Sequence, residues 1–81
     1  MDTYEASFEI NSRTDAYAVE RLVEQLYDAL REESRTLREG SDDSRDMLTN
    51  FEEILDATKK HKPGTLTVIY KQSNEGFDGH L

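Results

Sequence analysis

Few residues in this 81-residue chain are of the types that carry enzyme chemistry. There is no cysteine, which excludes disulfides, thiol nucleophiles and zinc sites built on thiolates. Of the two histidines, His61 lies among three lysines and His80 is next to the end of the chain. No serine or aspartate has a spacing that indicates a catalytic triad with either histidine, and no glycine-rich phosphate loop is present. We therefore expect no catalytic residue, no cofactor-binding residue and no enzymatic activity.

Three aspartates form a candidate site for a hard cation. Asp42, Asp43 and Asp46 lie within five residues, and Mg²⁺ or Ca²⁺ prefers such oxygen ligands. However, the segment lacks the glycine and the glutamate of a calcium-binding loop. Its place at the expected start of a helix explains the acids by capping and by compensation of the helix dipole. We therefore expect no metal site.

A row of arginines is the first candidate for binding. Arg31, Arg35 and Arg38 recur at helical spacing, so they lie on one side of the expected helix and could hold a phosphate or a carboxylate. Three glutamates are interleaved in the same turns and largely neutralise the row. We expect these arginines to serve in pairing between helices, within the chain or across a dimer.

A cluster of lysines is the second candidate. Lys59, Lys60 and Lys62 form the only basic cluster, and Lys71 could join it because it ends the strand that follows. Basic residues beside aromatic side chains can bind nucleic acid. Tyr70 fits the core instead, and no motif of an RNA-binding sheet is present. The lysines and the histidine between them are also explained as compensation of the helix dipole in a last turn.

The charge balance narrows the classes of partner. The chain has 18 acidic and 10 basic residues and a formal net charge of −8, which disfavours non-specific binding to nucleic acid. This acid-rich, lysine-poor composition resembles that of small acidic proteins of halophilic archaea, in composition only, and the resemblance implies adaptation to high salt. Two other interpretations stay open: an ordinary acidic protein, or a surface that imitates a nucleic-acid backbone. For the latter, Glu20, Glu24 and Asp28 would form an acidic row on a helix.

The sequence gives no sign of a membrane segment or a leader. The longest apolar run is only four residues, 16–19, too short to span a bilayer. The first residues contain no basic segment followed by an apolar stretch, so we expect no signal peptide and a cytoplasmic protein.

Two strands are predicted, one near each end of the chain. Residues 3–10 alternate strictly, with Tyr4, Ala6, Phe8 and Ile10 on one face, which predicts one buried and one wet face. Residues 65–72 alternate in the same way and are rich in β-branched side chains. Ile69 falls on the polar face of the second strand, which indicates that something covers that face.

Two helices are predicted between the strands. The first runs from Thr14 to Glu39, capped by Ser12 or Thr14 and ended by Gly40. After the tight connection 40–43, the second helix has Ser41 or Asp43 as its cap, residues 59–62 as its last turn, and a stop at Pro63–Gly64. The apolar stripes comprise Val19, Leu22, Val23, Leu26 and Leu30 in the first helix and Met47, Leu48, Phe51, Ile54, Leu55 and Thr58 in the second.

These elements predict an α+β fold of two layers in the order β-α-α-β, with antiparallel strands packed on a helical hairpin. We expect residues 1–72 to form one domain and residues 73–81 a flexible tail, in which Phe77 docks locally. Phe8, Leu26, Phe51 and Val68 should meet in one core. Because a two-stranded sheet is barely stable alone and the core is small, we expect a homodimer, which would complete the sheet by joining two sheets into one of four strands or would pack the helical hairpins into a bundle.

The leading functional hypothesis is a small, acidic, cytoplasmic, non-enzymatic protein that acts through protein–protein interaction as a homodimer. The candidate interaction residues are Arg31, Arg35, Arg38, Lys59, Lys60, Lys62 and Ile69. The alternative is an inhibitor of the phage or anti-defence type that imitates nucleic acid. The third hypothesis is a nucleic-acid-binding regulator that uses residues 59–62.

Overall fold

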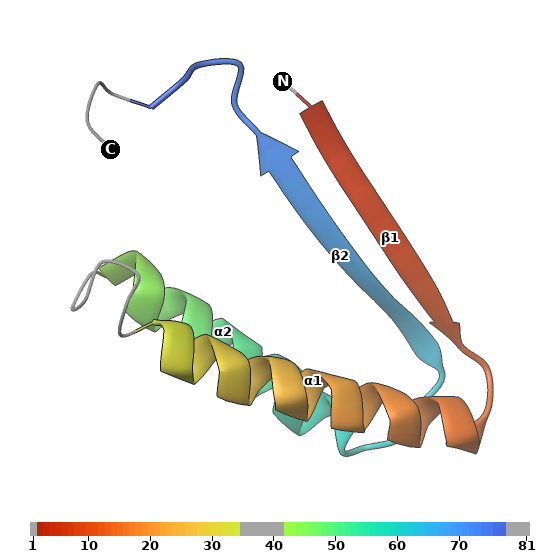
Figure 1. The fold of residues 1–81 in the computed structure, drawn as a ribbon. Coiled ribbons are helices and arrows are strands. Elements are labelled where there is room, and N and C mark those ends of the chain that lie inside the picture. Colours follow the sequence, from red (N-terminus) through yellow and green to blue (C-terminus); the bar gives the residue numbers. More distant parts are fainter. Residues whose placement is uncertain (1, 35–41, 78–81) are drawn as a thin grey trace.

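The chain folds in the predicted order β-α-α-β. The computed structural model describes residues 2–34 and 42–77. The elements are β1 (Asp2–Ile10), α1 (Arg13–Glu33), α2 (Asp42–Thr58) and β2 (Gly64–Gln72). The two strands pair antiparallel, and the two helices lie side by side below them (Figure 1). The predicted α+β class and the antiparallel pairing of the terminal strands are confirmed.

The strands pair over their whole length. The register runs from Asp2 opposite Gln72 to Ile10 opposite Gly64 without interruption. The even-numbered side chains form the face toward the helices, because Ile10 and Leu66 pack on the buried core. The odd-numbered face is polar, and two of its cross-strand pairs are hydrogen-bonded. Ser7 and Thr67 are 3.1 Å apart at their hydroxyls, and the Thr65 hydroxyl donates to Oε2 of Glu9 at 3.0 Å.

The first helix starts at Arg13, directly after a capping residue. Ser12 is extended, and its side chain accepts a hydrogen bond from the backbone N–H of Asp15 at 3.1 Å. The carboxylate of Asp15 in turn accepts from the N–H of Asn11 at 3.0 Å. Ser12 is therefore the cap, and Thr14 lies inside the helix. The helix ends at Glu33, six residues before the predicted end, and the predicted stop at Gly40 lies outside the described residues.

The second helix differs from its prediction at both ends. It begins at Asp42, so Asp43 is inside the helix, and Ser41 lies outside the described residues. It ends at Thr58, so residues 59–62 are not its last turn as predicted. The backbone continues in tighter hydrogen bonds that reach back three residues, up to the one from the N–H of His61 to the carbonyl of Thr58 at 3.2 Å.

The two layers diverge from one end, which we call the vertex, so the molecule is V-shaped (Figure 1). Short connections at the vertex join β1 to α1 and α2 to β2. The radius of gyration is 15.3 Å and the extents are 48 × 28 × 15 Å. A compact domain of this length has a radius of gyration of about 12 Å. The chain is therefore more open than a typical single domain.

The core is confined to the region near the vertex. Ala16, Val19, Val23 and Leu55 are the buried apolar residues. Ile10, Tyr27 and Leu66 are half-buried and pack against three of them. The prediction of one continuous core was wrong, because Phe8, Leu26 and Val68 are 46%, 37% and 56% exposed. The strands leave the helices beyond the vertex, so their inner side chains lose the surface that would cover them. Within the described residues, neither helix is long and apolar enough to cross a bilayer.

Candidate interaction surface

The inner face of the sheet presents uncovered apolar side chains. Tyr4, Val68 and Tyr70 are each more than half exposed. Tyr4 and Tyr70 are paired across the strands, and their rings are stacked with centroids 6.4 Å apart. Aromatic side chains bury much apolar surface when covered, and here both rings stay more than half exposed despite their stacking. The residue types of this face are those of a buried strand surface, but its side chains are as exposed as those of a face in contact with solvent.

The helices contribute apolar side chains that are also uncovered. Leu22 and Leu26 lie on the same stripe of α1 as the buried Val19 and Val23, and both are exposed. Ile54 of α2 is 43% exposed although it is part of the predicted apolar stripe. We call this set, together with the inner face of the sheet, the open apolar surface. Its members are Tyr4, Phe8, Leu22, Leu26, Ile54, Val68 and Tyr70.

A half-open cavity of about 380 Å³ lies at the vertex. Ile10 and Leu66 from the strands and Ile54 from α2 line it, together with the connection 60–64. The cavity is mostly apolar, and its only ionisable linings come from that connection. A cavity of this size is common in small-molecule sites, but those sites also carry convergent polar groups. The cavity and the open apolar surface have Ile54 in common.

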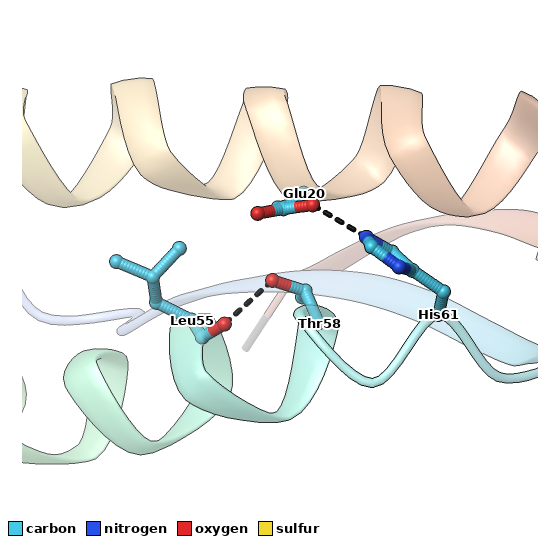
Figure 2. A network of polar contacts seen from close by, with 4 residues as sticks. All are labelled: Glu20, Leu55, Thr58 and His61. Atoms are coloured by element: carbon cyan, nitrogen blue, oxygen red, sulfur yellow. Dashed lines mark hydrogen bonds and ion pairs between the residues drawn. The ribbon is translucent and has the colours of Figure 1, made fainter.

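The side chain of His61 links the connection after α2 to α1. Its Nε2 is 2.6 Å from Oε1 of Glu20, and both side chains are about one quarter exposed (Figure 2). The imidazole also lies against the ring of Tyr17, with centroids 4.2 Å apart. Just before this contact, the Thr58 hydroxyl donates to the Leu55 carbonyl at 2.6 Å and closes the last turn of α2 (Figure 2). These contacts hold the vertex together.

The partner of His61 could not be predicted from the spacing of residues in the sequence. Glu20 is 41 residues away, and the run of lysines around the histidine suggested dipole compensation alone. The backbone of His61 has φ of 52°, in the left-handed region, where histidine is one of the better tolerated residues. This conformation turns the chain toward β2 and the ring toward α1. Glu20 therefore does not belong to an outward acidic row with Glu24 and Asp28, as was predicted.

The lysines are separated by the fold. Lys59, Lys60 and Lys62 are exposed in the connection at the vertex, where Lys59 lies 3.9 Å from a carboxylate oxygen of Asp56. Lys71 is opposite Thr3, at the far end of β2. Seven residues of strand separate it from Gly64, or roughly 23 Å. The expectation that Lys71 joins the other lysines was wrong.

The described part of the arginine row is a single residue. The Arg31 guanidinium lies over the ring of Tyr27, with its carbon 5.6 Å from the ring centroid. Arg35 and Arg38 lie outside the described residues. In residues 2–34 and 42–77, no group of three acidic or histidine side chains could hold a metal ion. The side chains of Asp42 and Asp43 are not among those described.

Among the described residues, three large exposed apolar side chains lie outside the open apolar surface: Tyr17, which packs against His61, and Ile69 and Phe77. Ile69 is 53% exposed on the polar face of the sheet, so any cover for it must come from outside the described chain. Phe77 is 90% exposed, so the prediction that it docks locally was wrong. It follows β2 in a segment without regular structure.

Comparison of the chain with protein-family models, with curated proteins and with solved structures finds no match.

Proposed function

We propose that this chain is a non-enzymatic protein that acts by binding another protein, and that it works as a homodimer. The observation that carries the proposal is the open apolar surface. Apolar side chains on the inner face of the sheet and on the apolar stripes of both helices remain exposed, and the two layers diverge beyond the vertex (Figure 1). Exposed apolar side chains gathered on one side of a fold are typical of protein interaction sites.

The accessible area agrees with this proposal. The chain has a mass of 9.4 kDa and an accessible surface of 6872 Å². A compact monomer of that mass exposes about 5,000 Å², so this chain exposes roughly 1,900 Å² more. If each of two copies buried half of that excess, the interface would total roughly 1,900 Å². That is the size of stable specific interfaces, which bury about 1,200–2,000 Å².

The other two hypotheses receive less support. For imitation of nucleic acid, the proposed acidic row loses Glu20, which faces His61 at 2.6 Å. For a nucleic-acid-binding regulator, the lysines of the vertex do not share a surface with Lys71, and Lys59 is near Asp56. Neither interpretation uses the open apolar surface.

The assembly can be tested by sedimentation velocity at micromolar concentration, in moderate and in high salt. We expect a dimer whose population falls on dilution, because its apolar interface forms by mass action. A strict monomer in both salts would contradict the proposal.

A pair of aromatic variants locates the interface. Tyr70→Ser removes an aromatic ring from the open apolar surface, and we expect it to raise the dimer dissociation constant at least about tenfold. Phe77→Ser removes a more exposed ring outside that surface and is the matched control, with an expected change below about threefold. Equal effects of the two variants would show that the space between the layers is not the interface.

A further inference from the structure

The sheet has two unpaired edges, one on each strand. β1 and β2 pair only with each other, so the outer backbone groups of both strands are without sheet partners in the described residues. Unpaired edges are templates for another strand, and natural proteins protect them with charges, prolines, bulges or very short strands. Each strand here is nine residues long, and the register has no bulge. The edges therefore differ mainly in their side chains.

The two edge strands differ in the charges that they carry. β1 carries Asp2, Glu5 and Glu9, so pairing along β1 would place the carboxylates of one copy beside those of the other, whereas pairing along β2 leaves the two β1 strands at opposite outer edges. β2 has no acidic residue, and its only charged residue is Lys71. The acid-free stretch is longer than the strand, because residues 57–74 contain neither aspartate nor glutamate. All 18 acidic residues lie in the remainder of the chain. Like charges placed opposite one another destabilise strand pairs, so two copies approach most easily along β2.

The uncharged side chains of β2 also favour pairing. Its centre is a run of β-branched residues, Thr65, Thr67, Val68 and Ile69, with no proline. Ile69 is more than half exposed on a face that is otherwise polar. Its cross-strand neighbour within the chain is the charged Glu5, which covers it less well than an apolar side chain would. A second β2 would place Ile69 beside β-branched side chains on its other flank.

We propose that a second copy of this chain pairs antiparallel along the free edge of β2, so that two sheets join into one of four strands in the order β1-β2-β2-β1. This rests on the proposed homodimer and specifies its interface. The pairing is isologous, with the two-fold axis through the middle of β2. Both helical hairpins then lie on the same face of the joined sheet. The vertex of each copy lies beside the open end of the other sheet, where Tyr4 and Tyr70 are uncovered.

Single cysteines test the pairing directly, because the natural chain has none. One cysteine is placed at each of positions 65–71, and the matched controls are the paired positions 3–9 of β1. In an antiparallel two-fold pair the residue on the axis lies opposite its own copy, within the 4.4–6.8 Å that a disulfide spans. We expect rapid covalent dimer formation at one position of β2 and its nearest neighbours, and none in β1. Circular dichroism confirms that each variant is folded.

A pair of charge variants gives an independent readout. Ile69→Lys and Ser7→Lys each add one lysine to the middle of a strand on the polar face. We expect Ile69→Lys to raise the dissociation constant at least about tenfold, because lysines from the two copies would lie close together. Ser7→Lys should change it less than about threefold.

The outcomes separate this inference from the proposal on which it rests. A dimer that cross-links through β1, or through neither strand, or that dissociates with Ser7→Lys and not with Ile69→Lys, would overturn the β2 pairing and leave the homodimer standing. A monomer under all conditions would overturn both.

Discussion

At the scale of single residues, the contact between His61 and Glu20 is the feature on which the vertex depends. It joins α1 to the connection that leads into β2, and Tyr17 packs on the other side of the ring. Both partners are about three-quarters buried, so water screens the contact less than it screens a surface pair. The left-handed backbone at position 61 costs about 1 kcal/mol for a residue with a side chain, and the contacts of the ring offset that cost.

A double-mutant cycle measures this contact. We expect His61→Ala and Glu20→Ala each to lower the free energy of unfolding by about 1–2 kcal/mol, with a coupling energy of about 0.5–1.5 kcal/mol. Urea unfolding at one fixed protein concentration measures both quantities. Glu24→Ala, on an exposed position of the same helix, is the control and should change stability by less than about 0.5 kcal/mol. Strictly additive effects of the two substitutions would show that the side chains do not interact.

At the scale of elements, two side chains form the hydrogen bonds at the start of α1. The Ser12 oxygen accepts from the N–H of Asp15, and the carboxylate of Asp15 accepts from the N–H of Asn11, where the chain turns from β1 into the helix. The sequence alone left Ser12 and Thr14 as equal candidates, because both are good capping residues two positions apart.

Substitution of the two candidates tests the cap. We expect Ser12→Ala to lower the free energy of unfolding by about 1 kcal/mol, because it leaves a helix N–H without its partner. Thr14→Ala should change it by less than about 0.5 kcal/mol, since Thr14 is exposed inside the helix and alanine favours helices. Thermal and urea unfolding provide the measurement. A larger loss of unfolding free energy from Thr14→Ala than from Ser12→Ala would show that Ser12 is not the cap.

The order and type of all four elements could be predicted from periodicity, because alternation and helical spacing are local properties of the sequence. The strand bounds were right to within one residue. What could not be predicted is the angle between the layers. Phe8 and Val68 carry the pattern of core residues, yet a pattern says which face is apolar and not whether anything covers it. The contact between His61 and Glu20 was missed for a similar reason, since it depends on a backbone turn that no spacing encodes.

At the scale of the whole molecule, the net negative charge and the open arrangement of the two layers both reduce the stability of the fold. The net charge is −8, and the layers meet only at the vertex, so repulsion among acids opposes a small core. Salt screens exposed charges over a distance of about 10 Å at 0.1 M and about 3 Å at 1 M. We propose that the acidic surface is an adaptation to high salt, as the composition suggests.

A salt titration of folding tests this proposal. We expect the free energy of unfolding to rise by about 1–2 kcal/mol between roughly 0.1 M and 2 M NaCl, because screening relieves the repulsion of the folded state. Urea unfolding followed by circular dichroism is the measurement. A variant with Glu24→Gln and Asp28→Asn, both exposed on α1, should show a smaller rise. Equal stability at both salt concentrations would leave the acidic surface in need of another explanation.

The pairing of the first strand with the last has a consequence for synthesis of the chain. Asp2 lies opposite Gln72, so β1 leaves the ribosome before both helices and its partner β2 leaves after them. The helical hairpin, whose contacts are local, can assemble before β2 is available to pair with β1. Translation that stops before Gly64 therefore releases a strand with two unpaired edges and its aromatic side chains in water.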